Sequence, residues 1–235
     1  METIEISGRV CNVISKGKDG AKIYMGIQSG EGEQAASIAS MIDELAPDIP
    51  YVMTAFESED WNGDFSPWKA PPVFGNEGFS GGGAYTLEWL ENECIPVIES
   101  SFANADSPRT IVGYSLSGLF SLWAMYESKL FSGCTSCSGS LWFPDWIEYA
   151  GKRKLPEGSC VYLSLGDREE RTKNAVMSSV GECTRKQGEF LSADFGVREY
   201  LFELNKGGHF NEPDLRMAKG AAWVLKSISK ADLKR

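Results

Sequence analysis

The chain has 235 residues, of which 42% are hydrophobic and 24% charged, as in an ordinary soluble globular protein whose core needs no cross-links. Its 33 acidic and 23 basic residues give a net charge of −10, which argues against nucleic acid as a partner because phosphate binding needs a cationic surface. No apolar run reaches the roughly 18 residues that span a bilayer. The N-terminus METIEISGRV has no basic region followed by an apolar one, so we expect no signal peptide, no membrane contact and a cytoplasmic location.

Short apolar runs alternate with amphipathic segments in the first half of the chain. The pattern predicts, in order, a leading hairpin or edge strands within residues 1–20, a strand at 22–28, a helix at 34–45, a strand at 51–56 and a helix at 84–101 kinked at Pro96. The stretch 57–83 interrupts the alternation and is rich in Gly, Pro and aromatic residues. We predict a long loop insertion there, ordered by its aromatic side chains.

The same alternation continues in the second half. The predicted elements are a strand at 109–114, a helix at 116–127, a strand at 131–138, a short helix at 144–150, a strand at 160–165, a helix at 172–190, a strand at 197–204 and a helix at 212–229. Strands that alternate with helices indicate an α/β protein with a mainly parallel sheet covered on both faces. No internal repeat is visible, so we expect one domain over residues 1–235.

Cysteine and histidine usage limits the chemistry. Cys134 and Cys137 form a C-x-x-C motif inside a predicted strand, whereas a redox motif needs a helix N-terminus and a zinc site needs two more ligands. We therefore expect the six cysteines to be mainly buried structural thiols. His209 is the only histidine, which excludes a multi-histidine metal site, and we predict neither a metal nor another cofactor.

Residues 113–118 read G-Y-S-L-S-G, which resembles the motif G-x-S-x-G with its second glycine one position later, and they lie between a predicted strand and a predicted helix. This context is typical of a nucleophile elbow, in which glycines allow a sharp turn that raises a serine above the sheet edge. Ser115 is the predicted nucleophile, since Ser117 would lie inside the first helical turn. The backbone N–H of Leu116 then points to where an oxyanion would form.

A serine nucleophile needs a base and an acid, which follow it in the order Ser, acid, His. His209 lies in the segment KGGHF after the last predicted strand, where this order requires the base. The preceding strand runs into Asp167, Glu169 and Glu170, and the pattern alone leaves the choice among these carboxylates open. Two of them are expected only to favour the N-terminus of the next helix.

Further binding residues are predicted around these groups. The loop Ser29–Gly32 follows the strand at 22–28, and we assign the second oxyanion amide to Gly30, with its neighbours as alternatives. Trp61, Trp68 and Trp142 are predicted to form an aromatic wall for an aryl-acyl substrate. The alternative for about half of the clustered aromatics is that they pack the long loop onto the sheet.

Several motifs beyond the elbow resemble those of one family of α/β-hydrolases. Residues 81–83 with 90–96 resemble its glycine stretch and "FLENELIP" helix, 64–67 its "DLTP" segment, 138–143 its "SPSLWW" segment, and 207–209 its "GGH". The chain thus resembles the esterases that include esterase D, the feruloyl esterases and the enterochelin-esterase-like hydrolases. The resemblance implies the α/β-hydrolase fold, a three-layer αβα arrangement, and Glu169 as the acid, at the last position of a G-x-x-E/D segment.

Two departures from the family pattern accompany this resemblance. The usual "LLHG" of the oxyanion strand is replaced by MGIQSG, which affects the identity of the second oxyanion amide. The arginine before "DLTP" is replaced by Asn62-Gly63, which removes an expected contact to a phosphate-type or siderophore-type anion.

These features predict a serine esterase that cleaves carboxylic esters through a Ser-His-acid triad and an acyl-enzyme. The expected partner is a small-molecule ester, of siderophore type or with a small aryl or acyl group. The alternatives are a thioesterase or acyltransferase on the same triad, and a non-catalytic binding protein with a hydrolase fold. A homodimer is compatible with the sequence, which determines neither the substrate nor the oligomeric state.

Overall fold

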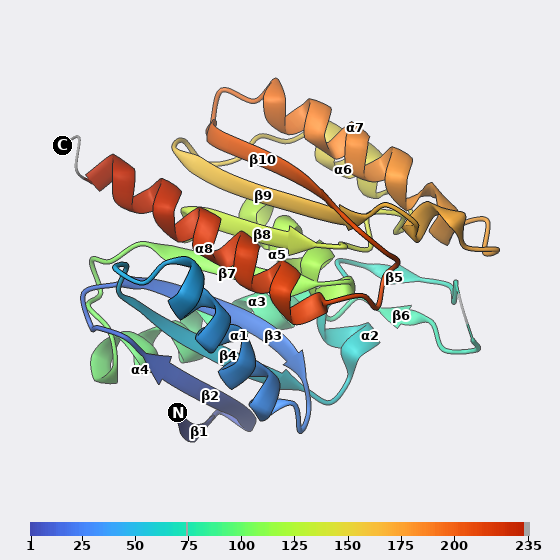
Figure 1. The fold of residues 1–235 in the computed structure, drawn as a ribbon. Coiled ribbons are helices and arrows are strands. Elements are labelled where there is room, and N and C mark those ends of the chain that lie inside the picture. Colours follow the sequence, from blue (N-terminus) through green and yellow to red (C-terminus); the bar gives the residue numbers. More distant parts are fainter. Residues whose placement is uncertain (74, 233–235) are drawn as a thin grey trace.

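The computed structural model describes residues 1–73 and 75–232, so residue 74 of the predicted insertion and the last three residues lie outside the described part. The main strands of this part are β1 (Glu2–Ile6), β2 (Arg9–Ser15), β3 (Ala21–Gln28), β4 (Tyr51–Ser58), β7 (Arg109–Tyr114), β8 (Gly133–Cys137), β9 (Ser159–Gly166) and β10 (Val197–Asn205). They form an eight-stranded sheet of order β1-β2-β4-β3-β7-β8-β9-β10 (Figure 1). β2 is antiparallel to β1 and β4, and all other neighbours are parallel, which confirms the predicted mainly parallel sheet.

Helices cover both faces of this sheet (Figure 1). On one face α1 (Gly32–Leu45) and α8 (Pro213–Asp232) lie side by side and bury residues such as Ile38 and Val224. The opposite face is covered by α3 (Gly83–Trp89), α4 (Ile95–Ser101), α5 (Leu116–Glu127), α6 (Trp146–Gly151) and α7 (Val180–Ser192). The three layers confirm the predicted αβα arrangement.

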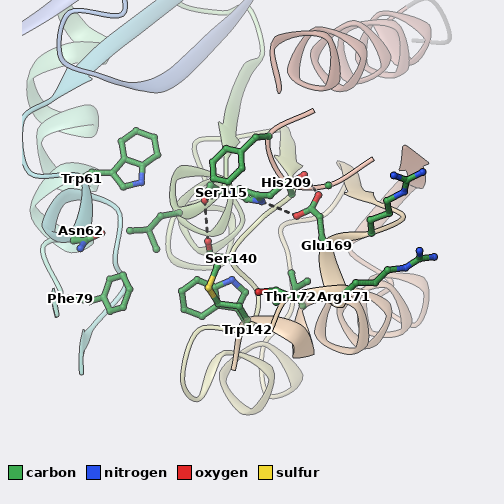
Figure 2. Close-up of a pocket in the computed structure, with 17 residues that line it drawn as sticks. Trp61, Asn62, Phe79, Ser115, Ser140, Trp142, Glu169, Arg171, Thr172 and His209 are labelled. Carbon is green, nitrogen blue, oxygen red and sulfur yellow. Dashed lines mark hydrogen bonds and ion pairs between the residues drawn. The ribbon is translucent and has the colours of Figure 1, made fainter. Parts of the chain in front are cut away.

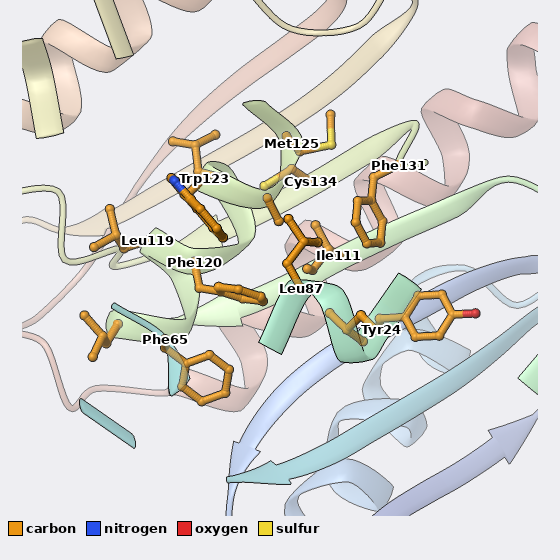
Figure 3. Close-up of a cluster of buried hydrophobic side chains, with 14 of the residues drawn as sticks. Tyr24, Phe65, Leu87, Ile111, Leu119, Phe120, Trp123, Met125, Phe131 and Cys134 are labelled. Carbon is orange, nitrogen blue, oxygen red and sulfur yellow. The ribbon is translucent and has the colours of Figure 1, made fainter. Parts of the chain in front are cut away.

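The strands bury alternate residues on the two faces. Along β3, Tyr24 joins the core under α5, whereas Ile23 and Met25 join the core under α1 and α8. Figure 3 shows the first of these cores, to which Phe120 of α5 belongs and in which the ring of Phe131 packs edge-on against Tyr24. Because both faces of a parallel sheet are covered, its strands are apolar along their whole length rather than in alternation.

The predicted helix at 84–101 contains a change of helical register. α3 continues through a π-helical segment, η1 (Leu90–Cys94), into α4. Pro96 lies near the start of α4 and has no N–H to donate to the preceding turn. A π segment accommodates such an unmade bond, so the chain remains helical across the predicted kink.

The prediction of a helix over residues 172–190 was wrong for its first turns, which are not regular α-helix. Regular helix begins only at α7, after two short 3-10 turns, η2 (Glu169–Arg171) and η3 (Met177–Ser179). Asn174 Oδ1 accepts hydrogen bonds from the backbone N–H groups of Val176 and Met177, at 3.0 and 3.1 Å. An asparagine that binds nearby backbone donors in this way competes with helix formation.

The segment 57–83 contains the short helix α2 (Trp61–Asp64) and a hairpin of β5 (Lys69–Ala70) and β6 (Phe79–Ser80). Arg9 of β2 anchors it through two hydrogen bonds to the Asp64 carboxylate, with N–O distances of 2.8 and 3.2 Å. Phe65 is fully buried behind α2. These contacts hold α2 beside the carboxyl ends of the parallel strands.

The parallel strands β7, β8, β9 and β10 end at one edge of the sheet. The pairings Tyr114 with Cys137 and Gly166 with Asn205 bring the segments that follow them to that edge. Ligand sites in open α/β sheets lie at this edge. Within the described residues, no helix has the length and apolar character needed to cross a membrane.

Candidate active site

Ser115 lies in a sharp turn between β7 and α5. Its backbone has φ 57° and ψ −121°, a conformation that costs a residue with a side chain about 1–3 kcal/mol. The turn needs glycine at 113, because an added Cβ there would lie 2.1 Å from the carbonyl oxygen of Ser117. Ser117 is almost fully buried, and its hydroxyl is bound to the backbone of Tyr114. Ser115 is therefore the serine of the motif that reaches the cavity.

The sole imidazole lies beside this hydroxyl (Figure 2). His209 Nε2 is 3.1 Å from Ser115 Oγ, and His209 Nδ1 is 2.8 Å from Glu169 Oε2. The hydroxyl of Tyr114 also donates a hydrogen bond to the carbonyl oxygen of His209. The structure thus brings together serine, imidazole and carboxylate from three loops at the sheet edge.

The three carboxylates after β9 have different contacts. Glu169 alone of them contacts His209. Asp167 Oδ1 accepts the backbone N–H of Gly207 at 2.8 Å, and Glu170 pairs with Arg185 at 3.0 Å on the surface. The acid that the resemblance implied is the one that the structure places against the imidazole.

Glu169 is 8% exposed and is held in its ionised form. Burial alone raises the pKa of a carboxyl group, but hydrogen bonds from His209 and Ser138 outweigh burial and lower the pKa of Glu169 below its usual value. The backbone N–H of Gly166 adds a further bond of 2.7 Å to Oε1. An anionic Glu169 accepts the N–H of the imidazole and so fixes the tautomer that leaves Nε2 free to accept a proton.

Sequence reasoning missed three polar residues at the site. Ser138 donates to Glu169 Oε1 at 2.7 Å, and Arg216 of α8 lies 2.9 Å from the same oxygen. Ser140 lies 3.4 Å from the Ser115 hydroxyl (Figure 2). One signal was available: Arg216 is a charge on the apolar face of the last helix, four residues before buried Gly220 and eight before buried Val224.

The two predicted oxyanion donors differ in position. Leu116 is the first residue of α5, so its N–H has no acceptor within the helix, and it lines the cavity beside Ser115. The N–H of Gly30 instead donates to Glu57 Oε2 at 2.8 Å, and Gly30 is not among the described residues that line the cavity. The structure therefore does not bring Gly30 to the site, because an acidic side chain on β4 already binds its amide.

The cavity around Ser115 has a volume of about 620 Å³ and mostly apolar walls. Trp61 and Phe79 form one side and Trp142 another (Figure 2). Met177, Val180 and Phe210 also contribute apolar surface to the lining. This size lies within the roughly 300–1,000 Å³ of small-molecule sites.

Trp68 does not reach this cavity. Its ring packs on Phe143 and Tyr149, with centroid distances of 5.8 and 5.1 Å, and its Nε1–H donates to the carbonyl of Pro144 at 3.1 Å. The predicted aromatic wall is therefore only partly present, and one of its three tryptophans instead packs the long loop onto the protein, as the alternative proposed. Trp61 and Trp142 line the cavity, whereas Trp68 joins the β5–β6 hairpin to α6.

Cys134 and Cys137 are fully buried in β8, with both thiols reduced. Burial raises the pKa of Cys137 to about 12, so its thiol is neutral over the physiological range. The interpretation of this motif as structural thiols agrees with their position in the sheet.

The mainly parallel sheet with helices on both faces is the fold of the α/β-hydrolases. A family model described as "Putative esterase" matches residues 23–211, and the chain belongs to this family. It is accordingly an ester hydrolase. Comparison with curated protein sequences finds no match.

Solved structures with the same fold include several hydrolases. An IroE-like serine hydrolase from Shewanella oneidensis is 18% identical with a TM-score of 0.75, over 93% of this chain and 75% of that chain. The siderophore hydrolase EstA from Aspergillus nidulans is 16% identical with a TM-score of 0.70, over 93% and 90%. The enterobactin esterase Fes from Shigella flexneri is 16% identical with a TM-score of 0.65, over 94% and 56%.

Proposed function

We propose that the chain hydrolyses carboxylic esters through an acyl-enzyme formed on Ser115, with His209 as the base and Glu169 as the residue that orients it. The observation that carries the proposal is the continuous contact from Ser115 Oγ through both nitrogens of the only imidazole to Glu169, at 3.1 and 2.8 Å. These are hydrogen-bonding distances, as proton transfer requires.

The reaction proceeds in two steps. Ser115 Oγ attacks the ester carbonyl carbon while His209 Nε2 takes the hydroxyl proton, and the oxyanion that forms accepts the N–H of Leu116. The tetrahedral intermediate expels the alcohol, which receives the proton from His209. Water then attacks the acyl-enzyme with His209 again as base, and the acid leaves from Ser115.

The substrate we propose is a small-molecule ester with an aryl or extended acyl group. The apolar surfaces of Trp61, Phe79 and Trp142 suit such a group. The siderophore hydrolases among the structural neighbours support esters of that type as candidates. Hydrolysis across p-nitrophenyl esters of increasing acyl length, beside a catecholate-siderophore ester, distinguishes these candidates.

A fluorophosphonate probe tests the nucleophile. We expect wild type to be labelled and Ser115→Ala not to be, because the probe reacts only with an activated serine. Ser140→Ala is the matched control: its hydroxyl lies 3.4 Å from that of Ser115, but no contact to the imidazole is seen in the described structure. Equal labelling of Ser115→Ala and wild type would refute the proposal.

A further inference from the structure

Arg216 is a buried charge that the proposed mechanism does not yet use. It lies in the first turn of α8, and its side chain is only 2% exposed. It is not among the described residues that line the cavity, so it is not positioned to touch a substrate. Taking a guanidinium out of water is costly unless its partners compensate, which raises the question of what its hydrogen bonds accomplish.

The guanidinium is one of three donors to a single oxygen of Glu169. Arg216 Nη1 donates to Glu169 Oε1 at 2.9 Å and to Ser138 Oγ at 2.9 Å, while Ser138 donates to the same Oε1 at 2.7 Å. Together with the N–H of Gly166, three donors therefore converge on Oε1. The other oxygen, Oε2, is left for His209 Nδ1. This arrangement prevents the carboxylate from rotating away from the imidazole.

The same guanidinium also binds the loop that carries the imidazole. Arg216 Nη2 donates to the carbonyl oxygen of Gly208 at 3.0 Å, and Nη1 lies 3.3 Å from the hydroxyl of Tyr114. Tyr114 precedes Ser115 and donates in turn to the carbonyl of His209. One planar group with donors on both sides thus connects the loops after β7, β9 and β10, a task that suits the fork of arginine and not the single ammonium of lysine.

We propose that Arg216 is a positioning residue for the ester hydrolysis described above: its fork fixes Glu169 and the His209 loop in register, and its charge balances the Glu169 carboxylate beside the imidazole. The proposal rests on the proposed function for its kinetic consequences. Its structural consequence, a change in the titration of the sole imidazole, can be measured without any substrate.

Charge and geometry are separated by two substitutions. Arg216→Gln keeps a hydrogen-bonding side chain but removes the cation, so a proton binds the Glu169–His209 pair more readily. We expect the acidic limb of the kcat/KM profile to move to higher pH by about one unit, as for loss of a charge at hydrogen-bonding distance. Arg216→Lys keeps the charge but loses the fork. For Arg216→Lys we expect the acidic limb of the kcat/KM profile to stay at the wild-type pH. We expect KM to be unchanged and kcat to fall on the order of tenfold to a hundredfold.

The other titratable groups packed around this pair do not produce the same shift. Burial raises the pKa of Tyr114 and of Cys137 to about 12 in each case, so both are neutral throughout the profile. Asp167 faces the His209 loop through the N–H of Gly207, and Arg168 and Arg171 line the cavity; all three are present in every variant. A displaced limb therefore reports the loss of the Arg216 charge.

Because the chain has one histidine, NMR of an untagged protein shows a single imidazole spin system. We expect its chemical shift to titrate about one pH unit higher in Arg216→Gln than in wild type, and at the wild-type midpoint in Arg216→Lys. Arg198→Gln is the control. Arg198 also binds a carbonyl of α8, that of Ser227 at 2.9 Å, and its loss is expected to lower the melting temperature without moving the titration.

Superimposable titration curves of Arg216→Gln and wild type would overturn the proposal. If Arg216→Gln does not fold, Arg216→Lys decides, and a wild-type kcat in that variant would overturn it as well. If wild type hydrolyses no ester, the proposed function fails, but the NMR titration still tests the role of Arg216.

Discussion

Gly26 of β3 offers a sharp test of how the site wall is supported. A Cβ added at this position would lie 2.4 Å from Cζ and 2.5 Å from Cε1 of Phe65. The Phe65 ring cannot easily turn away, because it packs on Trp61 and Phe120 with centroid distances of 4.8 and 5.5 Å. We therefore expect Gly26→Ala to lower the free energy of unfolding by about 1–3 kcal/mol, the usual cost of overfilling a core.

Shortening the ring should relieve the clash. Phe65→Leu removes the three outer ring carbons, including the two atoms that would lie closest to a Cβ at position 26; the Cζ of Phe56, at 3.3 Å, stays in place. At about 0.8 kcal/mol for each buried carbon, this substitution alone costs about 2 kcal/mol. Independent effects would sum to about 3–5 kcal/mol in the double variant. We expect the double variant to lose only about 2 kcal/mol, because the new methyl group fills space that the ring has left.

Urea and thermal unfolding of the four proteins measure this coupling. For a chain of this size, 1 kcal/mol corresponds to roughly 2–4 °C in melting temperature. Gly133→Ala is the control: its Cβ would meet Val224 at 2.4 Å on the other face of the sheet, so it should add to Phe65→Leu without coupling. A double variant of Gly26 and Phe65 that loses the full sum would show that the ring contact is not the cause.

Three further predictions concern the site itself. Trp142→Ala should raise KM for aryl esters about tenfold, whereas Trp68→Ala should leave KM unchanged; steady-state kinetics of folded variants decides. Gly113→Ala should lower kcat/KM about a hundredfold by displacing the elbow, which labelling rates with a fluorophosphonate check. Glu169→Gln should cost about 3–5 kcal/mol of stability at pH 7, because it leaves Arg216 buried without its anion. Since the folded-state pKa of Glu169 lies below its usual value of 4.5, this difference should be present above about pH 4.5 and shrink as the pH falls through the folded-state pKa, as unfolding measured from pH 7 to pH 3 will show.

The sequence was sufficient to predict which residues meet at the site, because each of them follows the end of a parallel strand. Residues that follow neighbouring parallel strands must meet at one edge of the sheet, so Ser115, Glu169 and His209 could be assigned to one site from the sequence alone. The lone histidine strengthened that prediction, since no competing imidazole existed. Local pattern and topology were sufficient here because each residue lies within a few positions of a strand end.

The errors arose where a side chain or amide had a choice of partners. Gly30 lies in the predicted loop, but its amide is bound by Glu57 from the neighbouring strand. Trp68 lies in the predicted segment, but the hairpin turns its ring toward Tyr149 of α6. The side chain of Asn174 accepts the backbone N–H groups of Val176 and Met177, which a helix would bind through its own carbonyl groups. Each outcome depends on tertiary contacts that residue type and spacing do not determine.

The buried charges of the site account for why the carboxylate and the arginine occur together. A lone buried carboxylate beside an imidazole would favour a proton on the pair, and His209 could then not act as the base. Arg216 at 2.9 Å balances the negative charge of Glu169, so this buried pair adds no net charge beside the imidazole. In the proposed reaction, transfer of the Ser115 proton creates an imidazolium and an oxyanion together. No net charge is therefore added to a cavity with mainly apolar walls, where an uncompensated charge would be costly.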